Sequence, residues 1–108
     1  MATLRTTRVN YPPRKHLIGI ARDKHTTYIA RASIFNAIPA MPYTAAMQAY
    51  GLRRARTGAY YTLGQARAFV GILKSDGYGD QARELDRLLN WAAQAALEHL
   101  GPIGVNRV

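Results

Sequence analysis

Residues 62–77 read TLGQARAFVGILKSDG, and this stretch contains signals for both the start and the end of a helix. Thr62 and Gln65 have the spacing of a capping box, in which the threonine hydroxyl accepts the amide hydrogen of the glutamine. The apolar residues that follow at helical spacing are Ala66, Phe69, Val70 and Leu73. Gly77 stands where a left-handed glycine commonly ends a helix. The stretch therefore predicts a helix over residues 63–75.

A second helix is predicted over residues 81–100, directly downstream. The intervening DGYG at 76–79 is a turn cluster, and Asp80 is placed to act as the N-cap. The apolar stripe of this helix comprises Leu85, Leu88, Leu89, Ala92, Ala96 and Leu100, with Trp91 beside it. Gly101 and the proline after it predict the helix end. Two helices joined by a short loop predict an antiparallel helical hairpin.

Upstream, the apolar spacing that begins at Tyr43 predicts a further helix over residues 43–56, with arginines in its last turn. Gly51 within this segment permits a turn instead. We expect the central basic helix to pack with the C-terminal hairpin.

The N-terminal third allows two interpretations. The β-branched and aromatic residues of 16–33, with a polar centre, favour a β-hairpin, which is the interpretation we prefer. Alternatively, Thr26 or Thr27 caps a helix that runs to Ile38. Residues 1–15 are expected to form an extended basic arm, and residues 101–108 an irregular tail.

The predicted fold class is mainly α, with α+β as the alternative, and residues 16–100 form its single small domain. A chain of 108 residues, nearly half of them apolar, is long enough to bury a core without help. It has no cysteine, which excludes disulfides, thiol nucleophiles and cysteine-ligated zinc. It also lacks a secretory signal and any apolar run long enough for a membrane span. We therefore expect a cytoplasmic protein of a bacterium or of a phage-infected host cell.

Positive charge is concentrated in the first half of the chain. The formal net charge is +9, and residues 1–60 contain ten Lys or Arg residues against the single acid Asp23. No carboxylate occurs between Lys24 and Ser75. A neutral half and a basic half suggest a scaffold that carries a cationic surface. The candidate binding residues are Arg5, Arg8, Arg14, Lys15, Arg22, Lys24, Arg31, Arg53, Arg54, Arg56, Thr57, Tyr60 and Tyr61.

Residues 45–61 also follow the order of a helix-turn-helix, with a helix, Gly51, and then a basic segment. Met47, where a small residue is usual, and Gly58, within the recognition segment, depart from that motif. The simpler interpretation is a helix that ends in solvated arginines before a tyrosine-containing turn. Because Tyr60 and Tyr61 adjoin a helix start, we expect one to pack in the core and the other to remain free.

Three functions are compatible with these features. The first is a non-catalytic nucleic-acid-binding protein, of DNA or RNA, that contacts the phosphate backbone through the arm and the central helix end. The second is a phage or mobile-element protein that inhibits a host protein by docking on an acidic or nucleic-acid-binding surface. The third is a small metal-independent ribonuclease, with His25 as acid or base and Arg22 on the phosphate. No catalytic pair, metal ligand set or cofactor motif is otherwise predicted.

Overall fold

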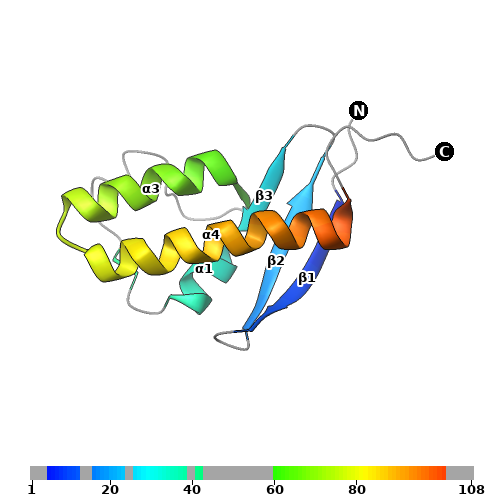
Figure 1. The fold of residues 1–108 in the computed structure, drawn as a ribbon, viewed down its shortest axis with the longest axis horizontal. Helices are drawn as coiled ribbons and strands as arrows, with labels where there is room; N and C mark the ends of the chain where they lie inside the picture. The colour runs from blue at the N-terminus through cyan, green and yellow to red at the C-terminus, as the bar shows by residue number, and fades with distance from the viewer. Residues whose placement is uncertain (1–4, 13–15, 24–25, 39–40, 43–59, 102–108) are drawn as a thin grey trace.

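A four-stranded antiparallel sheet with the two C-terminal helices packed against one face forms most of the described part of the protein (Figure 1). The computed structural model describes residues 5–12, 16–23, 26–38, 41–42 and 60–101. The strands are β1 (Arg5–Tyr11), β2 (His16–Arg22), β3 (Thr27–Ala30) and β4 (Tyr60–Thr62), which lie in this order across the sheet. The helices are α1 (Arg31–Ala37), α3 (Leu63–Ser75) and α4 (Gly79–Leu100).

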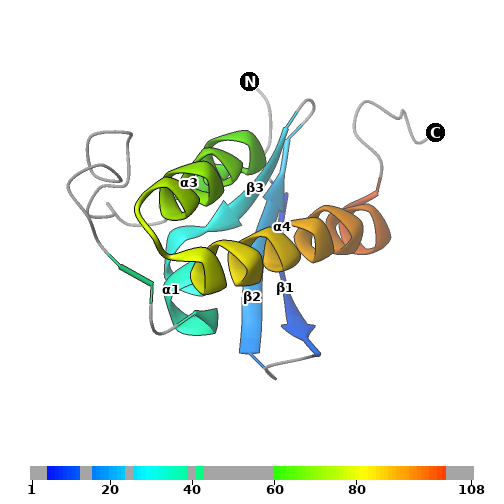
Figure 2. The same cartoon turned by 60° about the vertical axis from the view of Figure 1, so that its left-hand side comes forward.

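The core lies between the sheet and the pair formed by α3 and α4. Side chains alternate between the two faces of a strand, and the inward set of β2 and β3 is fully buried: Ile18, Ile20 and Ile29. The apolar stripe of α4 packs against this set and contributes Leu85, Leu88, Leu89, Ala92 and Ala96 to the same core. We call this side of the sheet the helix-covered face. Figure 2 shows α4 crossing the strands and α3 beside it.

Both C-terminal helices form where the sequence predicts them. The Thr62 Oγ1 atom accepts a hydrogen bond from the Gln65 amide at 3.0 Å, as expected for a capping threonine. Gly77 follows the end of α3 with a φ of 87°, a left-handed conformation that suits glycine. The expected N-cap role of Asp80 is wrong, because α4 begins two residues earlier and Tyr78 occupies the cap. Asp80 instead lies in the first turn and pairs with Arg83.

Two aromatic contacts attach these helices to the sheet. The ring of Tyr11 at the end of β1 lies 4.8 Å from that of Trp91 on α4, centroid to centroid. Tyr61 of β4 meets Phe69 of α3 edge to face, with ring centroids 5.2 Å apart. Tyr61 is therefore the tyrosine that packs, and Tyr60 is only half-buried.

The expectation of an extended arm over residues 1–15 is wrong for the central part of that segment, because residues 5–11 form strand β1. This strand pairs with the whole of β2, from Arg5 opposite Arg22 to Tyr11 opposite His16. Its inward residues become progressively more buried toward Tyr11, while Arg8 points to the other face and is exposed. The alternation of polar and apolar side chains has the period of a strand, but the scattered arginines and the prolines that follow obscure it.

Both interpretations of residues 16–38 contain part of the observed structure. Strands β2 and β3 form the favoured antiparallel hairpin. The chain then enters a helix, as in the alternative, but this helix begins only at Arg31. Asp23 orders the turn between the strands, since its Oδ1 atom accepts the Thr26 amide at 2.7 Å.

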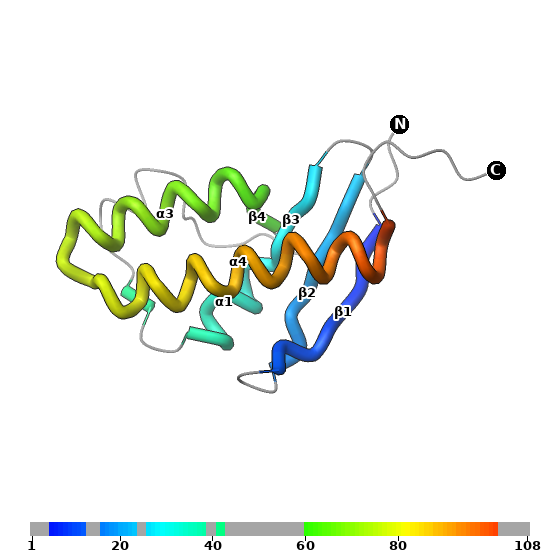
Figure 3. The backbone as a smooth tube through the Cα atoms, in the orientation of Figure 1, coloured from blue at the N-terminus to red at the C-terminus, as the bar shows by residue number. Residues whose placement is uncertain are grey.

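The fold class is thus mixed α/β, and the prediction of a mainly α protein is correct only in part. The sheet has four strands rather than one short hairpin, since β1 and the short β4 extend it on either side (Figure 3). The predicted helix 43–56, its packing, and the tail from 102 onward lie outside the described residues. Among the described residues, no helix is both long and apolar enough to cross a membrane.

Candidate functional site

The side of the sheet opposite α3 and α4 carries mainly exposed or half-buried side chains, and we call it the open face. Strand register assigns its residues, because directly opposed residues of antiparallel strands share a face. They are Thr6, Arg8 and Asn10 of β1, Leu17, Gly19 and Ala21 of β2, Tyr28 and Ala30 of β3, and Tyr60 and Thr62 of β4. Among them, Leu17 exposes 58% of its surface, which is unusual for a leucine in a strand.

A pocket of about 790 Å³ occupies one end of the open face, between the strands and α1. Its small floor residues are Gly19 and Ala30, which are neighbours across the sheet: a Cβ atom placed on Gly19 would lie 3.0 Å from that of Ala30. The lining residues are Thr6, Thr7, Arg8, His16, Leu17, Gly19, Ala30, Ala32, Ser33, Asn36 and Tyr60. The lack of side-chain bulk on the floor is what creates this hollow.

Helix α1 forms one wall of the pocket because it begins where β3 ends. The register of β2 and β3 stops at Ile20 and Ile29, so the next amide of β2, that of Gly19, has no strand partner there. The Ser33 hydroxyl oxygen on α1 accepts this amide at 2.8 Å. The hydroxyl of the buried Ser33 thus takes the place of a strand carbonyl as the acceptor for the Gly19 amide.

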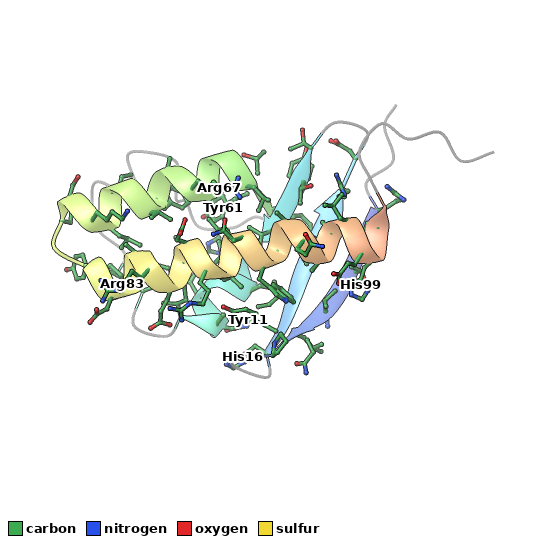
Figure 4. The ribbon with its side chains drawn as sticks, viewed as in Figure 1. Tyr11, His16, Tyr61, Arg67, Arg83 and His99 are labelled. Atoms are coloured by element: carbon green, nitrogen blue, oxygen red, sulfur yellow. The ribbon has the colours of Figure 1, made fainter. Side chains whose placement is uncertain are left out.

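The polar groups of the pocket are cationic or neutral. Arg8 is exposed, His16 is half-buried at the start of β2, and Tyr60 is half-buried on β4. None of the lining residues is an acid, although the chain has six. Asp23 lies in the β2–β3 turn, and the other five acids lie on α4 or in the turn before it: Asp76, Asp80, Glu84, Asp86 and Glu98. Figure 4 shows His16 at the end of the sheet and Arg83 near the start of α4.

Of the predicted site residues that the structure describes, Arg8 and Tyr60 line the pocket, whereas Tyr61 packs in the core. Arg5 is exposed, but it shares the register and face of Arg22. Arg31 lies on α1 with its guanidinium 5.6 Å from the centre of the Phe35 ring. The remaining candidates, together with His25, lie outside the described residues: Arg14, Lys15, Lys24, Arg53, Arg54, Arg56 and Thr57.

Arg22 does not belong to an exposed cationic surface. Only 3% of its surface is exposed, and its Nη1 group donates to the carbonyl of Gly101, just after α4. Its Nε atom is buried and has no hydrogen-bond partner in the described part of the chain. Burial, and then the positive charge of Arg5, lower the Arg22 pKa from its ordinary value. The phosphate-binding role that a ribonuclease would need from Arg22 has no support in this arrangement.

The sequence interpretation missed several residues of the open face. Tyr28 was not selected as a binding residue, and neither were Ser33 and Asn36 of α1. The alternation of β2 and β3 could have placed Tyr28 on the same face as Leu17 and Gly19. The serine and the asparagine gave no such signal, because their position depends on where α1 follows β3.

Tyr28 is fixed at the edge of the open face by a hydrogen bond. Its hydroxyl donates to the Asp23 Oδ2 atom at 2.7 Å. This hydrogen bond, followed by desolvation and the negative charge of Asp23, raises the Tyr28 pKa. The neutral hydroxyl is therefore favoured in the folded protein.

Replacing Tyr28 with Phe should reveal this preference as a pH-dependent loss of stability. A tyrosine whose pKa is raised on folding contributes its stability fully below its unfolded pKa, about 10, and loses it as pH rises through the folded value. We expect the free energy of unfolding of the variant to be lower than that of the native protein at pH 8. This difference in free energy should narrow above about pH 10. Urea titrations followed by Trp91 fluorescence would measure it. A difference that stays constant with pH would contradict the role of the hydrogen bond.

Comparisons of the whole chain with protein families, curated proteins and solved structures find no match. In the described residues there is also no group of three His, Asp or Glu side chains that could hold a metal ion.

Proposed function

We propose that this protein is a non-catalytic nucleic-acid-binding protein whose open face contacts the ligand. The observation that carries the proposal is the composition of the pocket, where Arg8 and Tyr60 of the open face occur together and none of the described lining residues is an acid. Arginine binds phosphate oxygens through its planar group of donors, and tyrosine supplies an aromatic ring and a further hydrogen bond.

The distribution of charge over the whole chain supports this function. The net charge is +9, while five of the six acids belong to α4 or to the turn before it, and α4 packs on the helix-covered face. A polyanion that approaches the open face therefore meets Arg8, and among the described acids only Asp23, which binds the Tyr28 hydroxyl, lies beside this face. Release of the counterions of the phosphates would supply much of the affinity.

Arg8 is better placed for binding on a strand than it would be on a free arm. Its backbone pairs with Gly19 of β2, so it is ordered before any ligand arrives. Only its side chain must then lose freedom on binding, which lowers the entropic cost of the contact.

Replacing Arg8 with Ala should weaken nucleic-acid binding about tenfold and reduce the slope of log K against log salt concentration by about one. The physical reason is the loss of one phosphate contact and of the counterion release that accompanies it. Fluorescence anisotropy with labelled oligonucleotides, measured between about 50 and 200 mM salt, would give both quantities.

The matched control is Arg67→Ala, which removes the same charge from an exposed position on α3, on the other side of the sheet. We expect this variant to bind almost as the native protein does. Equal weakening by both substitutions would show that net charge alone governs binding. Absence of binding by the native protein at about 50 mM salt would overturn the proposed function.

A further inference from the structure

We infer that the pocket on the open face receives an unpaired nucleobase, so that the protein binds single-stranded nucleic acid in preference to duplex. This inference rests on the proposed function and specifies the form of nucleic acid that the site recognises. The bases of a duplex are stacked on one another inside the helix, and only an unpaired strand can present the flat face of a base to a side chain.

The size and floor of the pocket suit a flat ring. Its volume of about 790 Å³ lies within the range of small-molecule sites and is ample for a base with its sugar. Gly19 and Ala30 form a floor that carries no side chain larger than a methyl group. A strand of ordinary composition would fill this space with a β-branched or aromatic residue.

Tyr60 supplies a stacking ring, and its orientation is fixed by the residue that follows it. Tyr61 is almost completely buried on the helix-covered face, where its ring meets that of Phe69. Side chains alternate along a strand, so Tyr60 must point to the open face. The pairing of Tyr60 with Ala30 then places it next to the pocket floor. Stacking on an aromatic side chain contributes substantially to single-strand binding and tolerates every base.

Polar groups around the ring are placed to bind the rest of the nucleotide. Arg8 lies on β1 opposite Gly19 and can reach a phosphate while the base occupies the floor. On the α1 wall, Asn36 exposes an amide, which can both donate to and accept from the edge of a base. The Ser33 oxygen already accepts the Gly19 amide, and its own hydrogen can still be donated.

The test compares three labelled oligonucleotides of about twelve nucleotides by fluorescence anisotropy: a thymidine strand, an abasic strand with the same sugar-phosphate backbone, and a duplex. We expect the thymidine strand to bind at least about fivefold more tightly than the abasic strand. Equal affinity for the two strands would overturn the inference but leave the proposed function intact. Tighter binding to the duplex than to the thymidine strand would also overturn it. If none of the three probes binds, as for a protein whose partner is another protein, both proposals are wrong.

Substitution of Tyr60 assigns the preference to this pocket. Tyr60→Ala should bring the affinity for the thymidine strand close to that for the abasic strand, and Tyr60→Phe should retain the difference because the ring remains. The matched control is Tyr78→Ala, which removes a tyrosine that is 36% exposed in the turn between α3 and α4. If Tyr60→Ala unfolds the protein, as judged by circular dichroism, the phenylalanine variant and the abasic probe still decide the question. A base preference that survives Tyr60→Ala in folded protein would overturn the inference.

Discussion

Phe69→Ala is expected to lower the free energy of unfolding by about 3–5 kcal/mol. Phe69 is 1% exposed and contacts Tyr61, so it joins α3 to strand β4. Truncation removes apolar surface from the core, leaves a cavity and abolishes the edge-to-face contact between the rings. Since the free energy of unfolding of a small domain is only about 5–15 kcal/mol, this substitution should remove a large part of it.

Urea-induced unfolding followed by Trp91 fluorescence and by circular dichroism would measure the loss. Trp91 is the single tryptophan of the chain. It lies on α4, packs against the core, and is distant in sequence from Phe69. Phe69→Leu is the matched variant: it keeps most of the buried volume and should cost clearly less. If the alanine variant is as stable as the native protein, α3 does not pack on the sheet through this ring.

Leu88→Ala is expected to cost about 2–5 kcal/mol. Leu88 is fully buried at the middle of the apolar stripe of α4, on the side that faces the sheet. Alanine preserves the helix, because its helix propensity is the highest of all residues. The loss therefore reports packing between α4 and the rest of the core rather than helix formation.

The same helix supplies the control for this substitution. Leu97 belongs to α4 but exposes 46% of its surface, so Leu97→Ala changes the same side chain without opening a buried cavity. We expect its effect to remain within about 0.5 kcal/mol. Comparable losses for the two variants would mean that the buried side of α4 has been assigned wrongly.

The two C-terminal helices could be predicted because their signals are local. The capping threonine, Gly77 and the apolar stripe of α4 all lie within the segments that they define. Strands β1 and β4 depend on pairing with distant residues instead. Strand β4 is only three residues long and pairs with β3, thirty or more positions upstream. Propensity over so short a segment does not specify a strand.

The candidate site was predictable only in part, for the same reason. Arg8 and Tyr60 could be selected by residue type, because exposed arginine and tyrosine often contact nucleic acids. The hollow between them arises from Gly19, Ala30 and the start of α1, which the fold brings together. Arg22 was misplaced because its charge suggested exposure, whereas the strand register turns it toward Arg5 and the end of α4.

The bond from Arg22 to the carbonyl of Gly101 joins residues that are 79 positions apart. The ribosome therefore synthesises Arg22 long before it synthesises Gly101, whose carbonyl accepts the hydrogen bond. Until α4 has been synthesised to its last turn, burying the guanidinium would leave a desolvated charge without that partner. We therefore expect the N-terminal strands to complete the sheet only after α4, the helix that covers them, has been synthesised.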